Sequence, residues 1–180
     1  MPITYLKGDI FELAAQRTDL HAIAFGTDIA GAMDSGISIA VKSRWPAFAD
    51  AFRVHCETTK MQLGDVFEWR DNNLVLYALG IQRAGTKPTI AAFDRATPIM
   101  IAKATEANVQ GIHLPRIGAG KEGLDWLRVK RILNDASAAT PLSFIVFEQF
   151  VRTGGNANAN AEPEEGTEAE AESADESADK

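Results

Sequence analysis

The chain has 180 residues, one cysteine and a formal net charge of −7. This length fits a single domain, and a hydrophobic share of 46% is enough to form its core. One cysteine excludes an internal disulfide framework and any metal site built from several cysteines. No apolar run approaches the ~20 residues that cross a bilayer, and the N-terminus lacks the layout of a signal peptide. We therefore expect a cytoplasmic protein that does not contact membranes.

The negative charge is concentrated at the C-terminus. Residues 153–180 hold nine of the 25 acidic residues and one of the 18 basic ones, so residues 1–152 carry a net charge of +1. This segment has no aromatic or branched apolar side chain, and burial therefore cannot offset the entropy that ordering would cost. We predict a folded domain over residues 1–152 and a disordered acidic tail over residues 153–180. The tail serves either as a solubilising extension or as a contact for a basic partner.

The apolar pattern alternates between the periods of strands and helices. In chain order it predicts a strand at 3–6, a strand at 20–26, a helix at 36–42, a helix from Pro46 through Cys56, a hairpin of strands at 65–70 and 74–79, a helix at 90–108, a strand at 111–115, a helix at 127–136 and a strand at 142–147. Pro46 suits the first turn of a helix, and the Asp-Asn-Asn segment at 71–73 is typical of a hairpin turn. This alternation predicts an α/β fold, a three-layer α/β/α sandwich around a mixed central sheet.

Three loops at predicted strand ends are rich in glycine, aspartate and serine: residues 7–10, 26–36 and 116–123. In open α/β sheets the ligand crevice lies beyond the carboxyl ends of the strands. Two of these loops place a glycine between a strand and a helix, at Asp34-Ser35-Gly36-Ile37 and at Gly118-Ala119-Gly120. Such junctions let backbone N–H groups approach an anion, although either one alone would also fit ordinary turn chemistry. Together they can hold a diphosphate from both sides.

The same segments resemble a known family. Ile3-Thr4-Tyr5-Leu6-Lys7-Gly8-Asp9-Ile10 resembles the strand and "GDI" turn that begin macro domains. Residues 33–38 resemble their first phosphate loop, and residues 114–120 resemble the "PxIGxG" second phosphate loop. Residues 83–89 and 114–126 are similar to one branch, which contains terminal ADP-ribose protein glycohydrolases and the antitoxin macro domains that reverse DNA ADP-ribosylation. The resemblance covers residues 2–150 and implies binding of ADP-ribose or of ADP-ribosylated protein, with DNA a partner only where it is ADP-ribosylated.

The resemblance also implies roles for individual residues. The carboxylate of Asp9 would accept the adenine amino group, with the backbone of Ile10 nearby, and Phe147 would lie beside the adenine. The residues implied at the diphosphate and the adjoining ribose are Ser35, Gly36, Ile37, Gly118, Ala119 and Gly120. The residues themselves leave alternatives open, because Asp9 also suits a helix N-cap and Phe147 also suits a plain core position.

Catalysis is where the sequence departs from the resembling branch. The lysine that acts at the ribose C1″ in those hydrolases aligns with Ile81, which cannot be a nucleophile. The acid of the second phosphate loop aligns with Glu122, which suits a helix start equally well, and Asp125 is a possible substitute. The asparagine that many macro domains place near the distal ribose is missing from residues 25–28.

We therefore expect an ADP-ribosyl hydrolase that acts on esters of Glu and Asp side chains without a lysine nucleophile. In it Glu122 activates water, and Asp34 and Ser35 border the distal ribose. The alternative is a non-catalytic reader that only holds ADP-ribose. His21 and His113 lie in apolar runs and are expected in the core, and the histidines form no metal-ligand spacing with Cys56. We expect neither a metal nor a cofactor.

Overall fold

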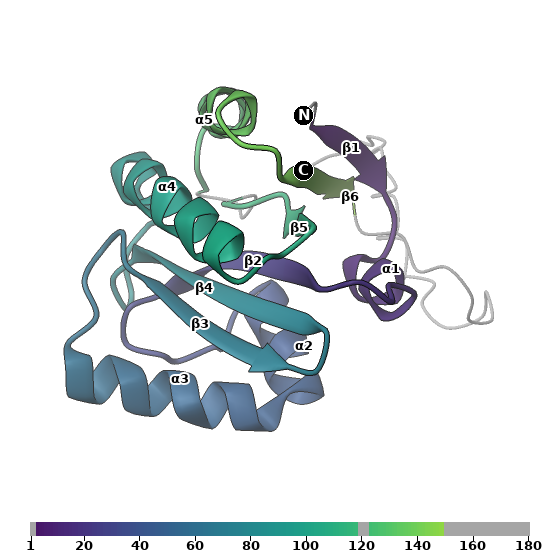
Figure 1. The fold of residues 1–180 in the computed structure, drawn as a ribbon. Coiled ribbons are helices and arrows are strands. Elements are labelled where there is room, and N and C mark those ends of the chain that lie inside the picture. Colours follow the sequence, from purple (N-terminus) through teal and green to yellow (C-terminus); the bar gives the residue numbers. More distant parts are fainter. Residues whose placement is uncertain (1–2, 119–122, 150–180) are drawn as a thin grey trace, which may run out of the picture.

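The computed structural model describes residues 3–118 and 123–149, which contain six strands and five helices (Figure 1). The strands are β1 (Thr4–Lys7), β2 (His21–Asp28), β3 (Val66–Asp71), β4 (Leu74–Gln82), β5 (Gly111–Pro115) and β6 (Ser143–Gln149). The helices are α1 (Ile10–Ala15), α2 (Ile37–Arg44), α3 (Pro46–Thr59), α4 (Ile90–Glu106) and α5 (Trp126–Ala138). The predicted acidic tail at residues 153–180 lies outside the described residues.

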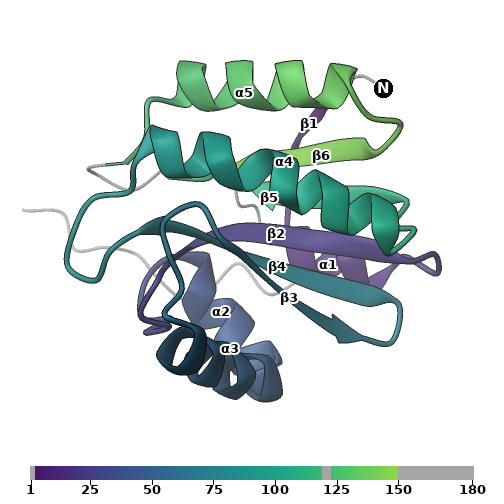
Figure 2. The same ribbon diagram turned by 60° about the vertical axis from the view of Figure 1, so that its left-hand side comes forward.

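The strands form one mixed sheet in the order β1-β6-β5-β2-β4-β3. Every neighbouring pair is parallel except β3 and β4, which form the predicted antiparallel hairpin. Helices α4 and α5 cover one face of the sheet, and α2 and α3 cover the other (Figure 2). The predicted α/β fold with three layers around a mixed sheet is therefore confirmed.

Two apolar cores result from the alternation of side chains along the central strand β2. Ala22 and Ala24 pack toward α4 and α5, whereas Ile23 and Phe25 pack toward α1, α2 and α3. All four side chains are fully buried, as expected for a parallel strand that helices cover on both sides. The centre of the sheet is thus a rigid base for the loops that follow its strands.

The structure differs from the sequence prediction mainly near the strand ends, and two of these differences bear on the cleft. Helix α1 was not predicted, because its six residues are too few to show a helical period. Strands β2 and β4 run two or three residues beyond the predicted ends, since their pairing continues through Gly26–Leu79 and Thr27–Gly80. As a result Ile81 belongs to β4 and not to the loop after it. Within the described residues, no helix combines the length and apolarity needed to cross a membrane.

Candidate functional site

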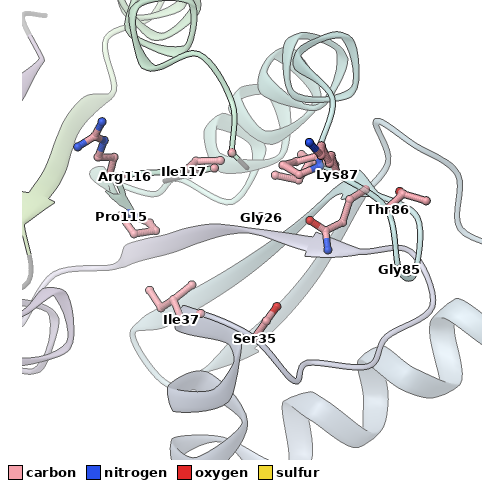
Figure 3. A pocket seen from close by; sticks show the side chains of 15 residues that line it. Gly26, Ser35, Ile37, Gly85, Thr86, Lys87, Pro115, Arg116 and Ile117 are labelled. Atoms are coloured by element: carbon pink, nitrogen blue, oxygen red, sulfur yellow. The ribbon is translucent and has the colours of Figure 1, made fainter. Parts of the chain in front are cut away.

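Two cavities adjoin at the carboxyl ends of β2, β4, β5 and β6. The larger cavity has a volume of about 650 Å³ and lies between the strand ends, the segment 35–37 and the turn after β4 (Figure 3). The smaller cavity has a volume of about 390 Å³ and lies between α1, α2 and the end of β6. Both cavities are lined by Gly36, Ile37, Pro115 and Arg116. These shared residues join the two cavities into one cleft, which we call the cleft below.

The first wall of the shared section is the junction between β2 and α2. Met33 has a positive φ of 49° and is 3% exposed, so its side chain anchors the loop in the core. Gly36 is the N-cap of α2 with a φ of 56° and no side-chain capping bond. The first N–H groups of α2 therefore remain as donors at the point where the cavities meet. Such donors, at the positive end of a helix, favour an anion.

The opposite wall is the junction after β5. Gly118 has a φ of 70°, and a Cβ at this position would lie 2.9 Å from the backbone nitrogen of Leu124 and 2.7 Å from its Cγ. The Leu124 amide donates to the Gly118 carbonyl oxygen at 2.8 Å, which holds these two residues together. Glycine is thus required here by both conformation and space. Of the residues expected in this loop, Ala119, Gly120 and Glu122 lie outside the described residues.

Asp9 is the N-cap of the unpredicted helix α1. The Phe11 amide donates to its Oδ1 at 2.8 Å. Asp9 is half-buried and is absent from the lining of both cavities, whereas the next residue, Ile10, lines the smaller one. The capping alternative is therefore realised in the structure. Contact of Asp9 with adenine stays a prediction.

Phe147 lies where β6 meets the smaller cavity. Its side chain is 6% exposed, belongs to the core on the α1 face and also lines the cavity. The His113 ring lies edge-on to it, with the ring centroids 6.1 Å apart. Phe147 is thus a core residue that also presents an aromatic surface to the cleft, and the two roles foreseen from the sequence are compatible.

The floor of the larger cavity is apolar. Ile81 is 3% exposed and lines the cavity from the end of β4. A Cβ at Gly26 would lie 2.3 Å from Cδ1 of Ile81 and 3.5 Å from Cγ2 of Ile117. Side chains at positions 26 and 81 therefore compete for the same volume. The floor offers no nucleophile at the position where the resembling hydrolases have lysine.

The polar candidates differ in whether they line the cleft. Ser35 lines the larger cavity, but Asp34 is exposed and outside the lining of both cavities. Asp125 is the N-cap of α5, and its Oδ1 accepts from the Leu127 amide at 2.9 Å. It also lies outside both linings. Its capping role explains an aspartate at this position without reference to catalysis.

Several cleft residues were not foreseen from the sequence. The end of β4 contributes Gln82 to the larger cavity, and the turn after it contributes Thr86 and Lys87. Arg116 lines both cavities. The Arg116 guanidinium lies 5.3 Å from the centre of the Trp126 ring. The sequence pattern did not indicate Lys87 as a site residue, because a single lysine in a loop does not by itself predict a binding or catalytic role.

The histidines and the cysteine lie away from the cleft lining. His21 and His113 are 2% and 1% exposed, with ring centroids 5.6 Å apart, so both are core residues as expected. Burial raises the pKa of Cys56 to about 11, and its Sγ contacts Met61 Sδ at 3.7 Å. Among the described residues, no group of three or more His, Cys, Asp or Glu side chains is placed to hold a metal ion.

The mixed sheet and the cleft between two glycine junctions define the protein as an α/β ligand-binding domain. Comparisons with known proteins identify the fold more closely. No family model matches the chain. The chain resembles the macrodomain of Thermus aquaticus DarG with a TM-score of 0.73 at 20% identity, over 82% of this chain and 98% of that one. The fold is that of a macrodomain.

Sequence relatives point the same way. The chain is 26% identical over 145 residues to ADP-ribose glycohydrolase OARD1 of Homo sapiens. The matched region covers 81% of this chain and 90% of that protein. It is also 26% identical over 144 residues to DNA ADP-ribosyl glycohydrolase of Mycobacterium tuberculosis, which covers 77% of this chain and 40% of that protein. The chain thus has the macrodomain fold and has relatives that are named as glycohydrolases of ADP-ribose linkages.

Proposed function

We propose that this chain binds ADP-ribose in the cleft. The adenine occupies the smaller cavity against Phe147, and the distal ribose occupies the larger cavity above Ile81. The diphosphate crosses the shared section between Gly36 and Gly118. The observation that carries this proposal is the pairing of two positive-φ glycine junctions on opposite walls of a cleft that is divided into two cavities. This division matches a ligand with two bulky groups joined by an anionic linker.

The bound ADP-ribose is released from a modified carboxylate side chain by hydrolysis. Water attacks the ribose C1″, the bond from C1″ to the ester oxygen breaks, and the carboxylate leaves with the electron pair. Because a carboxylate is a stable anion at neutral pH, this step does not need a lysine nucleophile. Glu122 is the proposed base for the water, and Ser35, which lines the larger cavity, borders the distal ribose. The names of the sequence relatives support a glycohydrolase in preference to a passive binding module.

A second candidate is a reader that binds ADP-ribose without cleaving it. The observation in its favour is the apolar floor formed by Gly26, Ile81 and Ile117. A reader would use the same cavities and the same glycine junctions. The two candidates differ only in turnover.

The modified partner is proposed to be protein. ADP-ribosylated DNA is the alternative, which is suggested by the name of the mycobacterial relative. Lys87 lines the larger cavity and Arg116 lines the shared section, and both substrates carry negative charge. Parallel assays on both substrates would separate them.

The first test measures release of ADP-ribose from a glutamate-linked ADP-ribosylated protein, for the wild type and for Glu122→Ala. We expect release by the wild type and a ~10²–10⁴-fold slower reaction in the variant, the range typical of general acid–base assistance. Asp125→Ala is the matched control, because Asp125 caps α5 outside the cleft and its loss should lower stability without slowing the chemistry. Tight binding of ADP-ribose without release above the uncatalysed rate would leave the reader as the function.

A further inference from the structure

The turn between β4 and α4 holds its residues in a fixed conformation. The Thr86 amide donates to the Arg83 carbonyl at 3.0 Å, and the Arg83 amide donates to Thr86 Oγ1 at 3.2 Å. Gly85 has a φ of 69°, which lets the chain reverse without strain. The Thr89 amide then donates to the Ile81 carbonyl at 2.9 Å, and this bond ties the start of α4 to the end of β4. The two residues between, at 87 and 88, are thereby held beside Ile81.

The turn thus places a cationic side chain, Lys87, at the larger cavity, whereas β4 contributes only the uncharged Ile81 and Gln82. Lys87 lines the same cavity as Ile81, and it carries the only ammonium group among the described lining residues. Lys87 and Ile117 lie on one side of this cavity, and Ser35 and Ile37 lie on the other (Figure 3). No carboxylate belongs to the described lining of the larger cavity. Lys87 therefore brings a positive charge to this side of the cavity.

We infer that Lys87 is a catalytic residue that stabilises the departing carboxylate of the modified side chain, a role that rests on the proposed hydrolase function. Ile81 forms the apolar floor below the distal ribose, so the ammonium group enters from the neighbouring turn. From there it faces the target side chain that is attached at C1″. Lys87 thereby specifies the linkage: the cavity favours an anionic leaving group over a neutral one.

The chemistry needs charge from Lys87 and not a proton. As the bond from C1″ to the ester oxygen breaks, negative charge develops on the leaving oxygens, and the oxygen of water forms the new bond to C1″. The water gives up one proton to base, and the carboxylate leaves ionised because its ordinary pKa is about 4. An ammonium group lowers the energy of the developing anion by a Coulombic interaction that grows in the transition state. An arginine at this position should therefore replace lysine, whereas a neutral side chain of similar length should not.

The rival role for Lys87 is binding of the diphosphate. The two roles predict different changes, because free ADP-ribose contains the diphosphate but no leaving carboxylate. A diphosphate contact lowers the affinity for ADP-ribose when the charge is removed. A leaving-group contact lowers kcat and leaves that affinity unchanged.

The experiment compares the wild type with Lys87→Met, Lys87→Arg and Arg83→Met in the full chain. Arg83 is the matched control, because its exposed side chain lies on the same turn, outside the cleft lining, and its backbone bonds survive the substitution. Each protein is assayed for single-turnover release of ADP-ribose from a glutamate-linked substrate and for the Kd of free ADP-ribose by calorimetry. Full removal of a preorganised donor costs ~10²–10³-fold in kcat, and screening by solvent at exposed Lys87 should reduce this to about 10- to 100-fold.

The expected result is a slower release in Lys87→Met, recovery to within about threefold in Lys87→Arg, and a Kd within about threefold of the wild type in every variant. Unchanged release by Lys87→Met would overturn the inference. So would a Kd weakened about tenfold in that variant, which would instead assign Lys87 to the diphosphate. Absence of release by the wild type despite tight binding would refute the proposed hydrolase function itself, and the inference with it.

Discussion

At the scale of single residues, Asp9 combines a structural role with a proposed binding role, and the two can be separated. Its Oδ1 accepts the Phe11 amide at 2.8 Å and caps α1. Asp9→Ala removes the cap and should lower the free energy of unfolding by about 1 kcal/mol, whether or not Asp9 contacts adenine. Asp9→Ser keeps a capping oxygen but has no carboxylate. It should retain nearly wild-type stability and, if adenine binds here, should weaken ADP-ribose binding about tenfold, a typical effect of losing one charged hydrogen bond.

The measurements are urea unfolding for stability and calorimetry for affinity, on both variants of Asp9. Asp125→Ser provides a parallel control, because Asp125 caps α5 in the same manner but lies outside both cavity linings. Wild-type affinity for ADP-ribose in Asp9→Ser would assign Asp9 to the cap alone. The adenine contacts would then come from Ile10 and Phe147, which do line the smaller cavity.

At the scale of elements, the junction between β2 and α2 depends on a backbone conformation that only glycine adopts readily. Gly36 has φ 56° and ψ −137°, and a Cβ there would meet no atom within 4 Å. Gly36→Ala is therefore strained by about 1–3 kcal/mol through conformation and not through a clash. To relieve this strain the loop must rotate the first N–H groups of α2. We expect ADP-ribose affinity to fall by about tenfold or more, and the melting temperature to fall as well.

A second positive-φ glycine provides the comparison for that prediction. Gly64 has a φ of 95° and lies outside both cavity linings, and its Cβ would meet the side chain of Arg95 at 3.0 Å. Gly64→Ala should lower the melting temperature to a similar degree and leave the Kd of ADP-ribose unchanged. Equal loss of affinity in both variants would mean that the junction at Gly36 acts only through global stability.

The elements also mark the limit of sequence reasoning for this chain. Strand β5 was predicted with its bounds as observed, because apolar runs that are buried on both faces carry a strong signal. The glycine junctions were predicted at Gly36 and Gly118, since few residues tolerate such turns. Helix α1 could not be predicted because it has only six residues. The position of Lys87 beside Ile81 could not be predicted either. That position arises from hydrogen bonds between residues 81 and 89 that no local pattern encodes.

At the scale of the whole molecule, a buried histidine connects the stability of the sheet to pH. His113 lies in β5 under the α1 face, with the ring of His21 at 5.6 Å and the ring of Phe147 at 6.1 Å. The pKa of His113 is lowered to about 4, mainly by burial and to a smaller extent by the nearby His21 and Arg17, whereas Asp19 acts in the opposite direction. Within the described residues, its Nδ1 has no hydrogen-bond partner. The folded protein therefore keeps this ring neutral at pH values where the unfolded chain would protonate it.

The sign of the pH dependence follows from this lowered pKa. Above the unfolded pKa of about 6.5 the ring is neutral in both states, and the stability is complete. As the pH falls from there toward 4, only the unfolded chain gains the proton, so we expect a loss of roughly 2 kcal/mol between pH 7.5 and pH 5. The lowered pKa of Asp19 acts below its ordinary value of 3.8, outside this window. Urea unfolding of the wild type and of His113→Phe at both pH values tests the assignment, because the variant should lose most of the difference. A difference that persists undiminished in the variant would place the acid sensitivity elsewhere in the fold.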